Sequence, residues 1–224
     1  MNFALKPYLL ILTAALLFSS CTAVYINENH RAPGFVTEQI AGKSITLIAT
    51  PQVAVREFVK TYYAAYPQDS LFTQDILLRL QNTLSPLQVG STVLTNFQVD
   101  GAALQVNSLN AAEIEKASHV FEQINSDYIF NISNILVGNR VETSYAAGAG
   151  PGGASTQTST EFCVVAFDVQ IWDRNSKTKV LEFVTTGESS VSFFMFESAL
   201  KDALDKAVIH ASEFIKTGTT VFNK

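Results

Sequence analysis

The segment Tyr128–Val191 constrains the fold most, because its hydrophobic residues recur at every second position. This period is typical of β-strands that bury one face. The apolar alternation covers Tyr128–Tyr145, Cys163–Ile171 and, after the polar turn 173–177, Val180–Thr186. The sequence therefore predicts three consecutive antiparallel strands.

A different period follows the strands. Apolar residues recur at helical spacing between Leu200 and Ile215, and charged residues occupy the opposite side. This pattern predicts an amphipathic helix that covers one face of the sheet, with Gly218 at its C-terminal cap. The same spacing predicts a second helix over residues 71–84, which Pro86 would stop.

The remaining elements are predicted from shorter signals. Ser44–Ala49 is apolar enough for a strand, and Thr50-Pro51 suits the start of a helix that carries Phe58, Tyr62 and Tyr63. A hairpin is expected around Asp100-Gly101, between segments 93–99 and 104–106. A capping-box pattern from Asn110 predicts a helix over residues 110–124.

The predicted fold class is therefore α+β. We expect a single domain with a mixed or antiparallel sheet, three consecutive C-terminal strands, and packed helices that include the C-terminal amphipathic helix. The domain is expected to span residues 43–218, with residues 219–224 as a tail.

The first twenty residues have the pattern of a targeting segment. Lys6 precedes the apolar run 8–18, which is about half as long as a membrane-spanning helix, and the small pair Ser19-Ser20 follows it. Residues 1–20 are therefore predicted to be a signal peptide. The alternatives are an uncleaved membrane anchor and a buried core helix.

The sequence Leu17-Phe18-Ser19-Ser20-Cys21 resembles the lipobox of bacterial lipoproteins, with Phe18 where the family usually carries Leu. The resemblance implies that the thiol of Cys21 carries a diacylglycerol and that its amino group carries a fatty acyl chain, such as palmitate. These acyl chains would anchor the protein in a membrane. Thr22 after the cysteine implies sorting to the outer membrane, facing the periplasm. Residues 21–42 are then expected to be the lipidated N-terminus and a tether.

Charge and cysteine content narrow the choice of partners. The chain has 15 Lys and Arg against 20 Asp and Glu, a net charge of −5, and its basic residues do not cluster. A nucleic-acid partner is disfavoured, because phosphate binding needs a cationic surface. If Cys21 is acylated, Cys163 is the only thiol left, so no intramolecular disulfide can form. Cys163 is expected to be a small buried hydrophobic residue.

No motif predicts catalysis, a metal or a cofactor. Segment 148–153 satisfies the G-x-G-x-x-G pattern of dinucleotide-binding proteins, but a strand follows it where the fingerprint needs a helix. Histidine and cysteine residues show no zinc-binding spacing, and no serine elbow is present. We therefore expect a protein without cofactor, metal or catalytic residues.

The Gly/Ser/Thr-rich segment Ser144–Thr160 is the candidate partner-contact loop, and Gly148, Gly150, Gly152 and Gly153 form its tip. A small polar tip that projects from a sheet is suited to contact with a partner. A loop without a role is the alternative.

The order of elements, together with segments 167–173 and 179–183, resembles the α+β domain of the curli-secretion lipoprotein and the amino-terminal domain of TolB. This chain lacks the glycine of the family's turn between the two strands. The resemblance implies a non-enzymatic envelope assembly or scaffolding role, with another envelope protein or a second copy as partner. The alternative function is a periplasmic small-molecule or lipid carrier, or a hydrolase, with an apolar pocket between the Phe58-Tyr62-Tyr63 helix and the sheet. A scaffold should have a filled core and an exposed, unpaired strand edge, whereas a carrier should have a closed apolar cavity.

Overall fold

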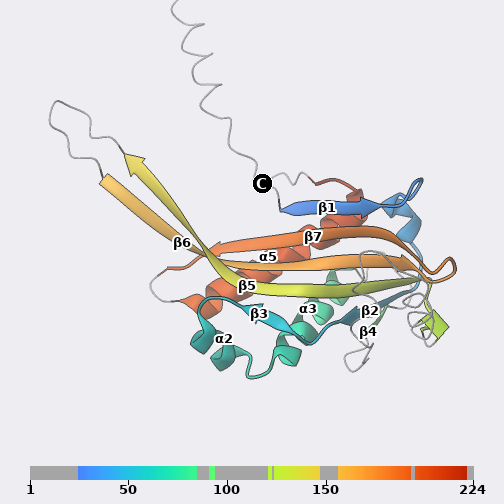
Figure 1. Cartoon of the computed structure of the whole chain (residues 1–224), viewed down its shortest axis with the longest axis horizontal. Coiled ribbons are helices and arrows are strands. Elements are labelled where there is room, and N and C mark those ends of the chain that lie inside the picture. Colours follow the sequence, from blue (N-terminus) through green and yellow to red (C-terminus); the bar gives the residue numbers. More distant parts are fainter. Residues whose placement is uncertain are drawn as a thin grey trace, which may run out of the picture.

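Three long strands dominate the computed structural model, which describes residues 25–84, 91–93, 121–122, 124–146, 156–192 and 195–220 (Figure 1). The elements in chain order are β1 (Ile26–Arg31), the 3-10 helix η1 (Thr37–Ile40), β2 (Ile45–Ala49), β3 (Val53–Val55), α2 (Val59–Ala65), α3 (Asp69–Leu84), β4 (Ser91–Val93), β5 (Tyr128–Ala146), β6 (Thr156–Asp173), β7 (Thr178–Ser190) and α5 (Phe196–Thr217). The strands within these described residues form one seven-stranded sheet in the order β1-β7-β6-β5-β2-β4, and β3 also pairs with β5.

The sheet is mixed. β5, β6 and β7 are consecutive and antiparallel, while β2 and β3 run parallel to β5. The predicted α+β class, the single domain and the three consecutive C-terminal strands are confirmed. Each of the three strands is longer than predicted, and β5 and β6 together form a hairpin that extends beyond the other elements (Figure 1).

One face of the sheet carries the hydrophobic core. The period-two residues of the three long strands point to this face and pack beneath α3 and α5. Cys163 lies among them and is fully buried, as predicted. The amphipathic stripe of α5 is also buried, and Gly218 at its C-terminus adopts the left-handed conformation that a glycine cap favours. The predicted C-terminal helix and its cap are confirmed.

The prediction of a tether over residues 21–42 is wrong from Ile26 onward. β1 pairs antiparallel with β7 along the edge of the sheet, and Ile26 is buried in the core. Only one residue of this strand is buried, so the segment has no apolar alternation by which it could be recognised. The domain therefore includes residues that precede the predicted boundary at residue 43.

The predicted helix start at Thr50-Pro51 is also wrong. Val53–Val55 form strand β3, which pairs in parallel with residues 135–137 of β5, and α2 begins only at Val59. The helix predicted over residues 71–84 is confirmed as α3, which begins two residues earlier.

Several predictions lie outside the described residues. These are the signal peptide, Cys21, the hairpin around Asp100-Gly101 and most of the helix expected over residues 110–124. In the described part of the chain, no helix is both long and apolar enough to span a membrane.

Candidate functional site

The projecting end of the β5–β6 hairpin, residues 139–146 and 156–160, is the first candidate site, and we call it the ribbon (Figure 1). In the described part of the chain, β3 pairs with β5 only as far as Val137, and β7 pairs with β6 only from Phe162 onward. Neither outer edge of the ribbon therefore has a neighbour among the described strands.

The direction of the free backbone groups follows from the hydrogen bonds at the base of the ribbon. The carbonyl oxygen of Val137 points away from β6 and accepts a hydrogen bond from the backbone N–H of Arg56. The pairing register has no irregularity between Leu136 and Ala146, so every second residue presents its N–H and C=O to the same side. Val141 and Tyr145 thus present their backbone groups outward on this edge.

The base of the ribbon is fixed to β7 by charged contacts. Arg140 donates hydrogen bonds to both carboxylate oxygens of Glu188, at 2.7 to 3.2 Å, and its guanidinium lies 4.5 Å from the ring centroid of Phe162. Beyond the contacts of Arg140 the ribbon is exposed, and Val141 and Tyr145 retain 57% and 73% of their maximal accessible surface. An apolar and an aromatic side chain thus stand in solvent on one face of a strand with a free edge.

The structure alters the predicted partner-contact loop at both ends. Ser144–Ala146 belong to β5 and residues from Thr156 belong to β6, so the loop predicted over Ser144–Thr160 is wrong for these residues. Gly148, Gly150, Gly152 and Gly153 lie outside the described residues.

Two of the three aromatic side chains that were proposed to line an apolar pocket, those of Phe58 and Tyr62, pack against other rings. Tyr62 is fully buried, and its ring packs on those of Tyr66 and Phe72 at centroid distances of 5.9 and 5.4 Å. The ring of Phe58 stacks on that of Phe196 in α5. Tyr62 is therefore part of the core and Phe58 packs against it, whereas Tyr63, whose ring lies 5.0 Å from that of Tyr62, is 43% exposed.

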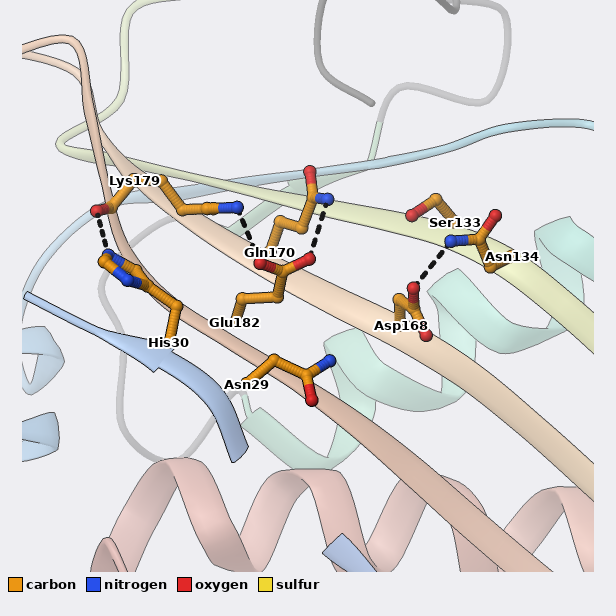
Figure 2. Close-up of a pocket in the computed structure, with 8 residues that line it drawn as sticks. All are labelled: Asn29, His30, Ser133, Asn134, Asp168, Gln170, Lys179 and Glu182. Atoms are coloured by element: carbon orange, nitrogen blue, oxygen red, sulfur yellow. Dashed lines mark hydrogen bonds and ion pairs between the residues drawn. The ribbon is translucent and has the colours of Figure 1, made fainter. Parts of the chain in front are cut away.

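A polar pocket is the second candidate site, and it lies on the sheet face opposite the core (Figure 2). It has a volume of about 690 Å³. Its walls come from β1, β5, β6 and β7 and consist of Asn29, His30, Ser133, Asn134, Asp168, Gln170, Lys179 and Glu182.

One wall of the pocket is a hydrogen-bonded network of buried polar side chains. Lys179 Nζ donates to Glu182 Oε2 at 2.6 Å, Gln170 Nε2 donates to Glu182 Oε1 at 3.3 Å, and Asn131 Nδ2 donates to Gln170 Oε1 at 3.3 Å. His30 Nε2 donates to the backbone carbonyl of Lys179 at 3.2 Å. The buried carboxylate is thus paired with a cation and an amide, which offsets its desolvation.

The opposite wall is shaped by a β-bulge in β5. The register with β6 shifts between Ser133 and Leu136, and Asn134 has a positive φ of 49°. The bulge places both Ser133 and Asn134 at the pocket. Asn134 Nδ2 donates to Asp168 Oδ2 at 2.6 Å (Figure 2). Burial raises the pKa of Asp168; the Asn134 hydrogen bond opposes this rise, and the nearby Glu182 adds to it.

Ser133 differs from the other residues of the pocket. Its side chain is fully buried, and its hydroxyl is one of three buried polar side-chain atoms in the described residues that have no hydrogen-bond partner. Buried polar groups are almost always hydrogen-bonded, so an unpaired one needs a reason.

The sequence did not predict this pocket. Its residues occupy the polar positions of strands whose apolar positions form the core, and a polar half of a period-two strand normally faces water. One sequence signal could have found the pocket. Polar residues cluster at neighbouring positions of two strands that are otherwise apolar, namely Asn131, Ser133 and Asn134 in one strand and Asp168 and Gln170 in the other. In the described part of the chain, no group of three His, Cys, Asp or Glu residues could hold a metal ion.

Comparison with known proteins finds no family model and no curated protein that matches this chain. The chain is similar to several solved structures. A homologue of the neuraminyllactose-binding hemagglutinin from Helicobacter pylori has 8% identity and a TM-score of 0.47, over 78% of this chain and 87% of that one. The PelC dodecamer from Paraburkholderia phytofirmans has 12% identity and a TM-score of 0.35, over 82% and 94% of the two chains.

A lipoprotein, GNA1162 from Neisseria meningitidis, is also among the similar structures, with 12% identity and a TM-score of 0.29 over 70% of this chain and 92% of that one. The similar structures therefore include a bacterial lipoprotein and an oligomeric protein. TM-scores below 0.5 do not establish a common fold, so these proteins assign neither a family nor a function to this chain.

Proposed function

We propose that this chain is a lipid-anchored protein of a bacterial cell envelope that binds another envelope protein through the ribbon. Acyl chains on Cys21 would hold it at the outer membrane on the periplasmic side. The role is that of a non-enzymatic assembly or scaffolding component. The observation that carries the proposal is the ribbon, whose two outer edges pair with none of the described strands.

An unpaired strand edge is suited to binding an extended segment of another protein. Backbone hydrogen bonds supply affinity in this mode, and neighbouring side chains supply specificity. The ribbon offers outward backbone groups at Val141 and Tyr145, and both side chains are exposed beside them. Soluble proteins usually protect such edges, since free edges pair with other chains.

The same edge could pair with a second copy of the chain, and the experiment separates these two partners. A photocrosslinking amino acid replaces Tyr145 in the full-length protein, expressed in the cells that make it. The matched control places the same amino acid at Ile209, which is 46% exposed on α5, away from the ribbon. We expect a discrete crosslinked product from position 145 and not from position 209, and mass spectrometry identifies it as another protein or as this chain.

A second pair of variants tests whether the backbone edge makes the contact. Val141→Pro removes the outward N–H, and the strand should tolerate it because proline is accepted at edge positions. Val141→Ala keeps the N–H but shortens the side chain. We expect Val141→Pro to lower the crosslink yield several-fold and Val141→Ala to lower it little. Equal yields from the two variants would mean that the edge is not the binding element.

The predicted loop tip is tested in the same assay. Deletion of residues 148–153 should leave the thermal unfolding midpoint unchanged, because the strands on either side pair without it. If the tip contacts the partner, the crosslink from position 145 disappears. An unchanged crosslink would remove the tip, but not the edge, from the interface.

A further inference from the structure

We propose that the polar pocket on the outer face of the sheet binds a small molecule that carries a primary ammonium group, with Asp168 as its counter-ion and the Ser133 hydroxyl as a second hydrogen-bonding partner. This inference is independent of the ribbon, because none of the residues that line the pocket belongs to the ribbon.

The hydrogen bonds already made in the pocket show which groups remain for a ligand. Lys179, Gln170 and Glu182 satisfy one another and form a closed wall. The side-chain amide of Asn134 donates a hydrogen bond to Oδ2 of Asp168. Within the described residues, Oδ1 of Asp168 accepts no hydrogen bond. The Ser133 hydroxyl likewise has no partner there. The unused groups therefore include a carboxylate oxygen, an amide oxygen and a hydroxyl, all able to accept hydrogen bonds.

The register of the sheet places these groups together. Ser133 on β5 lies directly opposite Asp168 on β6, and directly opposed residues of an antiparallel pair have Cβ atoms about 5 Å apart. The bulge adds Asn134 to the same group (Figure 2). A single ammonium group, with its three N–H donors, can reach all three acceptors.

Charge selects a cation over an anion. Lys179 and Glu182 form an ion pair whose side chains are only 14% and 10% exposed, so their charges cancel locally. Asp168 then leaves the pocket with a net negative charge. Burial raises the pKa of Asp168, which shows that its carboxylate lacks full solvation, and a bound cation would supply the missing stabilisation.

Calorimetric titration of the purified full-length chain tests the proposal, with cadaverine as the probe. We expect saturable binding of one cadaverine per chain with a Kd at or below about 1 mM. The uncharged analogue 1,5-pentanediol should bind at least about tenfold more weakly, because a hydrogen bond to a charged group contributes more than one to a neutral group.

Two pocket variants and one control locate the binding. Asp168→Asn should weaken cadaverine binding by about tenfold or more, and Ser133→Ala by several-fold. The control Asp202→Asn makes the same change of charge at an exposed position of α5 and should not alter the affinity. Thermal unfolding shows whether each variant is folded. If Asp168→Asn does not fold, the affinity of Ser133→Ala still decides the test.

Three results would overturn the proposal. The first is the absence of saturable heat with wild-type protein. The second is an affinity that neither pocket variant changes. The third is pentanediol binding as tight as that of cadaverine, which would mean that the pocket does not recognise a cation. Each of these outcomes leaves the proposed role of the ribbon unaffected, because the ribbon is tested by crosslinking.

Discussion

Gly187 lies where strand β7 and helix α5 approach most closely. A Cβ atom added at this position would collide with the backbone oxygen of Ala203 and the backbone nitrogen of Ala207. Neither atom can move without shifting the helix. We expect Gly187→Ala to lower the free energy of unfolding by about 2 kcal/mol or more, measured by urea denaturation.

A second glycine provides the matched control for this prediction. A Cβ atom at Gly138, on β5, would meet nothing within 4 Å, and this glycine does not have a positive φ. Gly138→Ala should therefore change the free energy of unfolding by less than about 1 kcal/mol and could raise it slightly. A similar loss in both variants would mean that the close approach of α5 to β7 does not require glycine.

Cys163 gives a prediction about reactivity. Burial raises the pKa of its thiol to about 12, with a further contribution from Glu161. The thiol therefore stays protonated at pH 8 in the folded protein, and the thiolate is the reactive form. We expect iodoacetamide at pH 8 to leave Cys163 unlabelled in the native chain and to label it within minutes in denaturant, as measured by intact mass.

The same shift links Cys163 to stability at high pH. The folded-state pKa lies above the ordinary value, so the contribution of this thiol to stability is fully present below the unfolded pKa. It is lost as pH rises from the ordinary thiol pKa towards about 12, because the unfolded chain ionises first. If Cys163 in the native chain is labelled at pH 8 as fast as in denaturant, both the raised pKa of the thiol and its link to stability at high pH are contradicted.

At the scale of elements, the sequence predicts best where one face is buried and the strand is long. The core-facing parts of β5 and β6, together with β7 and α5, follow from their periodicity, because each buries an apolar stripe. β1 and β3 were not predicted from the sequence. β1 is an edge strand with a single core residue, and β3 has only three residues. Their structure is decided by pairing with β7 and β5, which a local pattern does not contain.

The candidate sites divide in the same way. The ribbon follows from the sequence as a projection between two strands, although its length depends on pairing beyond the predicted strand ends. The pocket depends on a bulge at Ser133 and on contacts between residues far apart in the chain, such as Asn134 with Asp168. A sequence pattern specifies neither of these.

The contact between α3 and α5 gives a prediction about elements. Arg79 of α3 donates to both carboxylate oxygens of Asp75 and to Asp205 of α5, while its side chain is 26% exposed. Because solvent screens such an ion pair, we expect Arg79→Ala to lower the free energy of unfolding by only about 1 kcal/mol.

A second ion pair serves as the control for Arg79. Lys201 pairs with Glu197 within α5, where both side chains are more than half exposed, so Lys201→Ala should cost less than about 0.5 kcal/mol. Urea denaturation of the two variants gives the comparison. A loss for Lys201→Ala as large as that for Arg79→Ala would show that the contact between helices adds nothing to the local pairing.

At the scale of the whole molecule, the two faces of the sheet differ in chemistry. One face carries the hydrophobic core beneath α3 and α5, and the other carries the polar pocket and a buried ion pair. The β5–β6 hairpin extends past the end of the rest of the sheet (Figure 1). The apolar residues of the core are therefore different from the residues of the two candidate sites, so either site can be changed without altering the core.

The position of β1 affects how the domain would sit at a membrane. β1 begins at Ile26, five residues after Cys21, and five extended residues span at most about 18 Å. If Cys21 is acylated, the β1 edge of the sheet would lie close to the lipid headgroups rather than at the end of a long tether.

The final prediction separates anchoring from folding. Cys21 precedes the sheet, and the first described contacts are those of Tyr25, whose ring stacks on His210 and whose carbonyl accepts the N–H of Thr186. Cys21→Ala should therefore leave the thermal unfolding midpoint within about 2 °C of the wild type while abolishing acylation. Intact mass and membrane fractionation of both proteins provide the measurement. If the wild type carries no acyl mass and both proteins are recovered free of membrane, the lipobox interpretation is wrong, and the ribbon must then meet its partner without an anchor to concentrate it at the membrane.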